Sequence, residues 1–270
     1  MTDAFPEAAL TENALLGGRL RIAQPRQGFR ATSDALILAA AVPARPGEAV
    51  LELGVGAGAA ILALATRVPG IHAEGLELQP AYAALARRNA ARNAIPLEVH
   101  VGDVTDMPRP LRQRQFDHVL ANPPYFAEGR GTPAPDEARR TARHESAALS
   151  SWIEAARRRL RPGGTLTIIQ ATERLTELLR AADAAFGAIE IKPLAPRTGR
   201  PAPRFVARMR KGARGPLVLH APLVLHAGDR HERGGDSYAP AASAILRDAA
   251  PLAFDPREDP PSEGAAFHGG

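Results

Sequence analysis

The chain has 270 residues, of which 45% are hydrophobic and 23% charged, so it can form one large globular domain or two small ones. It contains no cysteine, which excludes disulfides, thiolate metal sites and a cysteine nucleophile, and fits a cytoplasmic location. The net charge of +5 suits a polyanionic partner, although arginine is overused at many unrelated positions. The N-terminus shows no signal-peptide pattern, and the longest apolar run, near residues 34–44, is too short to span a bilayer.

The first half of the chain is predicted to alternate strands and helices after a flexible leader at residues 1–15. Thr32, Ser33 and Asp34 form an N-cap cluster in front of an apolar run. Ser151 and Glu154 have the spacing of a capping box that would start a later helix. Strands are expected at 49–53, 73–78, 97–101, 116–121 and 165–170, and helices at 58–68, 80–93, 150–160 and 172–186. This alternation predicts an α/β fold with a doubly wound, mostly parallel sheet.

The second half predicts an antiparallel edge to that sheet. Residues 188–194, 204–211 and 216–227 look like strands without helices between them, which favours antiparallel neighbours. The last of these contains a tandem repeat, PLVLHA, which we interpret as two extended segments broken at Pro222. A single domain is therefore expected over residues 16–250, followed by a disordered tail at 251–270.

A glycine-rich turn follows the first strand of the alternating region. Gly54, Gly56 and Gly58 separate this strand from a helix, where glycine lets the backbone turn tightly and approach a ligand. If Ala59 fills the last place, the spacing fits a dinucleotide-binding turn. With Glu52 as a preceding acid, it equally fits the turn of methyltransferases. The glycines alone do not choose between the two.

Acidic residues follow the next two strands. Glu77 ends the second strand, where a carboxylate can accept hydrogen bonds from both hydroxyls of a ribose, with Leu78 beside it. Asp103 follows the third strand, where it can accept a hydrogen bond from an adenine amine while Val104 packs on the ring. Asp106 is a rival for the role of Asp103. These positions predict a nucleoside-containing cofactor.

The sequence Asn122-Pro123-Pro124-Tyr125 ends the fourth strand abruptly, because proline cannot continue a hydrogen-bonded ladder. The carboxyl end of this strand lies beside the switch point where open α/β sheets bind ligands. The Asn122 side-chain oxygen and the Pro123 carbonyl can accept the two N–H groups of a planar amine, and Tyr125 can stack on a flat base. Catalysis would then rest on positioning and electrostatics, without an enzyme nucleophile.

The turn at 52–58, Glu77, Asp103 and the tetrad at 122–125 resemble the motifs of class I S-adenosylmethionine-dependent amino-methyltransferases, which have a Rossmann-like fold. Flanking segments at 24–42, 139–145 and 222–246 are similar to the bacterial tRNA adenine-N6 methyltransferase family, which modifies an anticodon-loop adenine of valine tRNA. The resemblance covers about residues 15–250.

The resemblance to this family implies S-adenosylmethionine as cofactor, tRNA as partner, and Asn122, Pro123 and Tyr125 as catalytic residues. It further implies the cofactor-binding residues Glu52, Gly54, Gly56, Gly58, Glu77, Leu78, Asp103 and Val104, joined from the N-terminal side by Arg30, Thr32 and Asp34. Helix capping is an equally good explanation for Thr32 and Asp34.

An arginine-rich segment follows the tetrad. Arg130, Arg139, Arg140 and Arg143 can meet RNA phosphates, and a solvated charged loop is the alternative. The run at 157–161 reads as a solvated helix face. His220, His226 and His231 lack metal-ligand spacing, so no metal is expected. The charged segment at 228–238 is longer than in the family, which puts tRNA contacts there in doubt.

Three alternatives remain open from the sequence: protein glutamine methylation, an NAD-dependent dehydrogenase that uses the glycine turn and Glu77, and an RNA-binding module without catalysis. No catalytic Tyr-x-x-x-Lys pair supports the dehydrogenase. No membrane association is expected, and a monomer is favoured.

Overall fold

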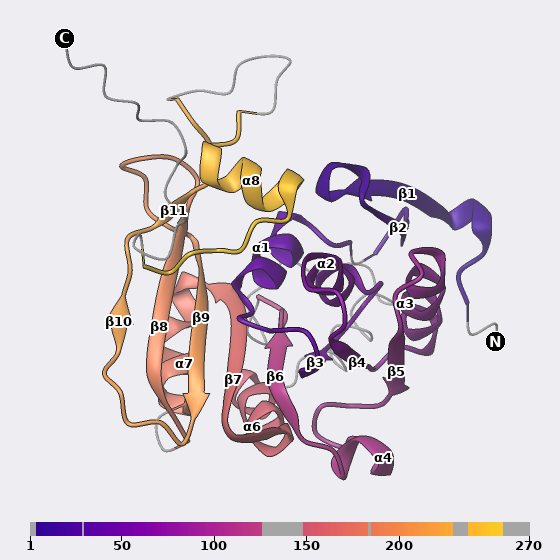
Figure 1. The fold of residues 1–270 in the computed structure, drawn as a ribbon, viewed down its shortest axis with the longest axis horizontal. Helices are drawn as coiled ribbons and strands as arrows, with labels where there is room; N and C mark the ends of the chain where they lie inside the picture. Colours follow the sequence, from indigo (N-terminus) through magenta and orange to yellow (C-terminus); the bar gives the residue numbers. More distant parts are fainter. Residues whose placement is uncertain (1–3, 29, 126–147, 183–184, 229–236, 256–270) are drawn as a thin grey trace, which may run out of the picture.

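A computed structural model describes residues 4–28, 30–125, 148–182, 185–228 and 237–255 (Figure 1). Its main feature is a nine-stranded sheet with the order β10-β8-β9-β7-β6-β3-β4-β5, in which β11 also pairs with β8. Helices cover both faces of this sheet. The predicted α/β fold with a doubly wound, mostly parallel sheet is therefore confirmed.

The parallel part of the sheet consists of β3 (Ala49–Leu53), β4 (His72–Glu77), β5 (Leu97–Val101), β6 (Phe116–Ala121) and β7 (Leu160–Ala171). The chain builds outward from β3 to β5 and then returns to the other side of β3 to form β6. This reversal leaves the carboxyl ends of β3 and β6 side by side, which is where open α/β sheets bind ligands.

The remaining strands are β8 (Phe186–Ala195), β9 (Arg204–Lys211), β10 (Val218–Leu219) and β11 (Leu223–Val224). As predicted, β9 is antiparallel to β8, and it also pairs antiparallel with β7. The prediction is wrong for residues 216–227, because β10 and β11 run parallel to β8. Since β7 and β8 occupy both edges of β9, the returning chain pairs with the outer edge of β8 and runs in the same direction as that strand.

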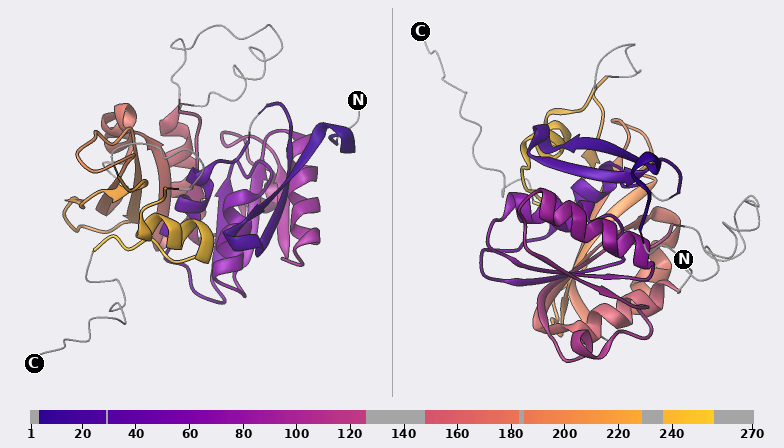
Figure 2. Two further views of the ribbon diagram at one scale, coloured as in Figure 1. Left: turned by 90° about the horizontal axis from the view of Figure 1, so that it is seen from above. Right: turned by 90° about the vertical axis from the view of Figure 1, so that its right-hand side faces the viewer.

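Helices form a layer on each face of the sheet (Figure 2). One layer contains α1 (Ser33–Ala41), α2 (Ala59–Arg67), α3 (Pro80–Arg92) and α8 (Pro240–Asp248), which pack into one apolar cluster. The other contains α4 (Arg109–Arg112), α6 (Leu149–Arg159) and α7 (Leu175–Ala182), which pack into a second cluster. Short 3-10 turns are η1 (Glu7–Ala9), η2 (Leu16–Gly18) and η3 (Thr172–Arg174). In the described part of the chain, no helix has the length and apolar character needed to cross a membrane.

A separate hairpin lies ahead of the sheet and corrects the predicted leader. Residues 10–15, assigned above to a flexible leader, form β1 (Leu10–Leu15) and pair antiparallel with β2 (Leu20–Pro25). The buried side chain of Asn89 in α3 holds the hairpin. Its amide nitrogen donates to the carbonyls of Ala23 and Ala57 at 2.9 and 2.8 Å, and its oxygen accepts from the Ala23 N–H at 2.9 Å. Tertiary contacts therefore order a segment whose local pattern looks weak.

Two predicted helix starts have different outcomes. The Thr32 hydroxyl caps α1 by accepting from the Asp34 N–H at 3.3 Å, as its place in an N-cap cluster predicts. The capping box at α6 is wrong, because the helix already begins at Leu149 and has no side-chain cap. Glu154 instead accepts hydrogen bonds from the guanidinium groups of Arg157 and Arg158, at 2.5 and 2.7 Å. These hydrogen bonds, chiefly that from Arg157, lower the pKa of Glu154 to about 2.

Candidate active site

A pocket opens at the carboxyl ends of β3, β4, β5 and β6, at the switch point of the sheet. The predicted site residues that line it are Gly54, Gly56, Glu77, Leu78, Asp103, Val104 and Asn122. They come from the ends of four different strands. The topology therefore gathers residues that are spread over nearly seventy positions of the sequence into one cavity.

The glycine turn forms the floor of this pocket, and its conformation requires glycine. Gly54, Gly56 and Gly58 have φ angles of +69°, +53° and +89°, a region that other residues rarely adopt. A Cβ atom on Gly54 would also lie 2.8 Å from the Trp152 ring. The backbone N–H groups of Gly54 and Val55 both donate to the Leu76 carbonyl, at 2.8 and 3.0 Å, which ties the turn to the end of β4.

Glu77 lies directly against this turn and is buried. One carboxylate oxygen accepts from the Gly56 N–H at 2.7 Å, and the other accepts from the Gln79 N–H at 3.0 Å. Burial raises the pKa of Glu77, and the backbone N–H groups only partly oppose this rise. Because a carboxylate oxygen can accept more than one hydrogen bond, both oxygens remain able to accept a ribose hydroxyl.

Glu52 and Gly58, predicted to bind the cofactor, are not among the pocket-lining residues. The Glu52 carboxylate turns toward α2 and accepts from the Ile61 N–H at 2.9 Å. Its pKa is raised well above the usual value by burial and by the nearby Glu77 carboxylate. Gly58 is the N-cap of α2. Both residues shape the start of the helix behind the turn.

Of the two acids after β5, only Asp103 lines this pocket. One of its oxygens accepts from the N–H and the hydroxyl of Thr105, at 2.7 and 2.6 Å, which leaves the second oxygen for a ligand. Asp106 belongs to a neighbouring groove and pairs with Arg112 at 3.7 Å. The geometry therefore favours Asp103 over its rival.

The tetrad after β6 brings Asn122 to the wall of the pocket. Among the residues that the structure describes, none forms a hydrogen bond with the Asn122 amide. The Pro123 carbonyl accepts a long hydrogen bond of 3.4 Å from the Gln170 amide, which leaves acceptor capacity for a second partner. The Pro124 carbonyl accepts from the Arg174 guanidinium at 2.8 Å. The Tyr125 hydroxyl donates to Asp34 at 2.5 Å. Of the three residues predicted to be catalytic, Asn122 lines this pocket, and Pro123 and Tyr125 lie next to its lining residues Asn122 and Pro124 without lining it themselves.

Arg30, Thr32 and Asp34, predicted to approach the cofactor from the N-terminal side, do not line the pocket. Arg30 donates to the Thr11 hydroxyl and the Pro25 carbonyl, both at 2.7 Å, and so ties the hairpin to the start of α1. Thr32 caps that helix, and Asp34 binds Tyr125. The predicted phosphate-binding residues Arg130, Arg139, Arg140 and Arg143 lie outside the described residues, as does His231.

Comparison with known proteins fixes the family. The sequence profile of the methyltransferase small domain family matches residues 31–192. The chain belongs to the methyltransferase small domain family. A solved structure of a predicted O-methyltransferase from Agrobacterium tumefaciens matches with a TM-score of 0.64 and 28% identity, over 81% of this chain and 97% of that one.

Two related proteins are both named tRNA1(Val) (adenine(37)-N6)-methyltransferase. The protein from Actinobacillus succinogenes is 34% identical over 161 residues, which cover 58% of this chain and 66% of that protein. The protein from Aeromonas hydrophila is 30% identical over 203 residues, which cover 73% of this chain and 84% of that protein. Family membership confirms the class I methyltransferase prediction and S-adenosylmethionine as the cofactor, and it does not favour the dehydrogenase.

The pocket of this family member fits such a cofactor. Glu77 offers two acceptor oxygens to a ribose diol, Asp103 offers one to an adenine amine, and Leu78 and Val104 offer apolar surface to a ring. The absence of a side chain at Gly54 lets the Trp152 ring pack directly against the turn.

Sequence reasoning missed several pocket residues: Leu76, Gln79, Tyr82, Gly102, Pro124 and Trp152. Gln79 could have been found, since it follows Glu77 at the same strand end. Trp152, the single tryptophan of the chain, comes from α6 on the far side of an arginine-rich segment. The local sequence does not predict the contact between Trp152 and Gly54, because this contact depends on how α6 packs against the sheet.

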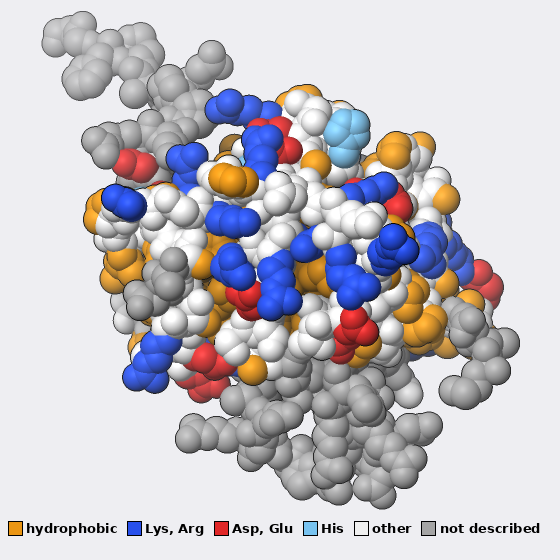
Figure 3. Space-filling model, turned by 90° about the horizontal axis from the view of Figure 1, so that it is seen from below, with side chains coloured by type: hydrophobic (Ala, Val, Ile, Leu, Met, Phe, Trp, Pro, Cys, Tyr) orange, Lys and Arg blue, Asp and Glu red, His pale blue; other side chains and the backbone are white. Residues whose placement is uncertain are grey.

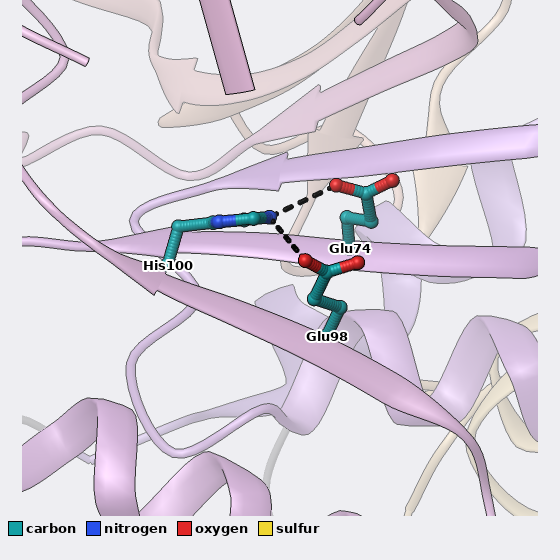
Figure 4. Close-up of side chains that lie close together, drawn as sticks. All are labelled: Glu74, Glu98 and His100. Atoms are coloured by element: carbon teal, nitrogen blue, oxygen red, sulfur yellow. Dashed lines mark hydrogen bonds and ion pairs between the residues drawn. The ribbon is translucent and has the colours of Figure 1, made fainter. Parts of the chain in front are cut away.

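Glu74, Glu98 and His100 form a second polar cluster on β4 and β5 (Figure 4). The ring of His100 lies 3.0 Å from Glu74 and 3.5 Å from Glu98. Arg114 pairs with both carboxylates, at 2.5 and 2.7 Å, and their hydrogen bonds raise the pKa of Arg114. Arg114 pairs with both acids, so the cluster is a salt-bridge network.

Proposed function

We propose that this protein is an S-adenosylmethionine-dependent N-methyltransferase that transfers a methyl group to the exocyclic amine of an adenine in tRNA. The observation that carries the proposal is the position of Asn122 on the same pocket as Gly54, Glu77 and Asp103. A site for a planar amine thereby adjoins a site for a nucleoside cofactor.

The chain's own residues account for the chemistry at the amine. The nitrogen of an adenine amine is a poor nucleophile because its lone pair is delocalised into the ring. When the Asn122 oxygen and the Pro123 carbonyl accept its two N–H groups, the nitrogen becomes more tetrahedral and its lone pair points into the pocket. When bound, S-adenosylmethionine would supply an electrophilic methyl group by cleavage of its S–CH3 bond, and the amine would release one N–H proton to solvent as the new N–C bond forms. Holding the amine in this geometry can supply roughly 7–11 kcal/mol of the barrier.

A nitrogen acceptor is favoured over an oxygen acceptor. Transfer to a hydroxyl requires a base to remove its proton. The polar side chain at the end of β6 is the Asn122 amide, which accepts hydrogen bonds but cannot take up a proton. The similarity to a predicted O-methyltransferase therefore supports the fold and not that acceptor.

An RNA acceptor is supported by the relatives and by charge. The relatives from Actinobacillus and Aeromonas are named as tRNA adenine methyltransferases. Lys and Arg side chains gather on the face shown in Figure 3. Helices α4 and α6 lie toward this face, and a groove lined by Arg112, Arg158 and Arg159 shares Val104 with the cofactor pocket. Such a groove can guide a phosphate backbone toward Asn122. A cytoplasmic location accords with a tRNA acceptor.

Methyl transfer from labelled S-adenosylmethionine tests the proposal. Unmodified tRNA and bulk protein are offered as separate acceptors, and the labelled product is digested and its nucleosides or amino acids identified. We expect N6-methyladenosine from tRNA, and none with Asn122→Ala. Label in glutamine, or in no RNA nucleoside, would reject the tRNA acceptor.

A further inference from the structure

Three elements that are distant in sequence meet at the hydroxyl of Tyr125. The hydroxyl donates to one oxygen of Asp34, the second residue of α1, at 2.5 Å. The other Asp34 oxygen accepts a hydrogen bond from the guanidinium of Arg204, the first residue of β9. These contacts cross 91 and 170 residues of the sequence, so only the folded chain creates them.

This triad places the carboxylate of Asp34 in the interior of the protein. The Asp34 residue is 2% exposed, and a carboxylate removed from water to that extent is stable only when it is paired and hydrogen-bonded. Arg204, the Tyr125 hydroxyl and the amino end of α1 together satisfy it. Any movement of the Tyr125 hydroxyl would leave a buried carboxylate oxygen without a partner, so the ring is held firmly.

The protonation of Tyr125 is also fixed. Burial and the Asp34 carboxylate both raise the pKa of this phenol, and Arg204 only partly opposes them. Tyr125 therefore keeps its proton and donates a hydrogen bond to Asp34. It cannot serve as a base for the acceptor amine, and its contribution to the site is its ring.

The backbone that precedes Tyr125 is also fixed by hydrogen bonds. The Pro124 carbonyl accepts from Arg174 at 2.8 Å and from the Gln170 amide at 3.3 Å. Both the peptide before Tyr125 and the hydroxyl at its far end are therefore anchored. The plane of the ring is set by side chains that do not belong to the cofactor pocket.

We infer that Asp34 and Arg204 are positioning residues for methyl transfer, which act through the Tyr125 hydroxyl to fix the ring on which the target base stacks. This inference rests on the proposed function and deepens it. It assigns Asp34 to the acceptor side of the site, in place of the cofactor contact predicted from the sequence.

Substitutions that keep volume test the inference. Asp34→Asn replaces one acceptor oxygen by a donor, Arg204→Met removes the guanidinium, and Tyr125→Phe removes only the hydroxyl. Since a displacement of about 1 Å can cost about 100-fold, we expect each to lower kcat/KM for tRNA by roughly 10- to 100-fold, with a higher KM and a lower kcat. The affinity for S-adenosylhomocysteine should not change. Arg204→Lys, which keeps the charge, should restore more activity than Arg204→Met.

A double-mutant cycle separates positioning from a general loss of stability. If Asp34 acts through the hydroxyl, the Asp34→Asn/Tyr125→Phe double variant is no slower than the slower single variant. Arg200→Met is the matched control, because Arg200 lies in the exposed segment just before β9, and it should keep wild-type kinetics.

The outcomes distinguish the inference from the proposed function. The inference would be overturned if the kcat/KM losses of Asp34→Asn and Tyr125→Phe multiply in the double variant. It would also be overturned if these variants lose affinity for S-adenosylhomocysteine. Either result would leave the proposed function standing. A wild-type enzyme that methylates no tRNA would overturn the proposed function together with this role of the triad.

Discussion

Glu77 shows how one side chain both builds the pocket and faces its ligand. Its oxygens hold the Gly56 and Gln79 N–H groups, so it fixes the turn against the end of β4. The same oxygens are the acceptors available to a ribose. The sequence predicts this position because parallel strands present their ends at one edge, but the two backbone partners appear only in the folded chain.

The ionisation of Glu77 predicts a pH dependence of cofactor binding. Burial raises its pKa above the usual 4.5, so the carboxylate becomes protonated at a higher pH than a free glutamate does. The affinity for S-adenosylhomocysteine should therefore be full at neutral pH and should weaken as pH falls through this raised pKa. Quenching of the single tryptophan, Trp152, which lines the pocket, provides the measurement.

Glu77→Gln is the matching substitution. It should weaken the neutral-pH affinity by roughly 10- to 100-fold, because hydrogen bonds to a charged acceptor contribute about 1.5–3 kcal/mol, and it should flatten the pH profile. The neighbouring Glu52 faces α2, so Glu52→Gln should keep the pH dependence. An unchanged profile in Glu77→Gln would show that another group controls binding.

Gly54 allows a second test at the scale of one residue. Gly54→Ala combines a strained positive φ with a contact of 2.8 Å to Trp152, so it should destabilise the fold by about 2–4 kcal/mol and weaken cofactor binding. Gly47→Ala is the matched control, since Gly47 has a φ of +86° and no atom within 4 Å of the added Cβ. It should cost about 1–2 kcal/mol. Equal unfolding free energies for the two variants in urea would contradict the account of the turn.

At the scale of elements, the β1–β2 hairpin depends on α3. Asn89→Ala removes three buried hydrogen bonds and leaves the Ala23 and Ala57 backbone groups unpaired. Each unpaired group costs about 1–3 kcal/mol, so the variant should lose at least about 3 kcal/mol of unfolding free energy. Urea denaturation measures this loss. Arg92→Ala, which removes an exposed ion pair between the same helix and Glu12 in the hairpin, should leave the midpoint unchanged.

The sequence predicts some elements well for a physical reason. The strands β3, β5 and β6 lie where they were expected. For β3 and β6 the reason is that buried parallel strands are short apolar runs bounded by turn residues. The hairpin at 10–25 was missed, although Gly17 and Gly18, both with positive φ, mark its turn. The helix α8 was missed as well, despite Pro240 in its first turn.

The direction of β10 and β11 could not be predicted from local pattern. Each copy of the PLVLHA repeat contributes one strand of two residues, and both pair with β8. The edge with which β10 and β11 can pair is the outer edge of β8, because β9 already lies between β7 and β8. The triad of Asp34, Arg204 and Tyr125 was hidden for the same reason, because its members meet only when α1, β6 and β9 are packed.

At the scale of the molecule, Lys and Arg side chains gather on one face, where they can act on a polyanion (Figure 3). The groove beside the cofactor pocket contains Arg112 and Arg158, whose side chains are 58% and 63% exposed. With Arg159, the lining of this groove has three arginines against two acids, Asp106 and Glu154.

Salt dependence tests whether this groove follows RNA. We expect Arg112→Ala/Arg158→Ala to weaken tRNA binding and to reduce the slope of log affinity against log salt by about 2, because each lost phosphate contact lowers it by about one. The affinity for S-adenosylhomocysteine should remain at the wild-type value. A wild-type salt slope in the double variant would exclude the groove as a phosphate-binding surface.

We expect Asn122 and the Pro123 carbonyl to hold a planar amine at the carboxyl end of β6, facing the cofactor. A crystal structure with S-adenosylhomocysteine and an adenine nucleotide would show this arrangement. We predict that the exocyclic nitrogen lies about 3 Å from both oxygens, with the base stacked on Tyr125. An adenine bound elsewhere, or an Asn122 amide turned away from the pocket, would contradict the account.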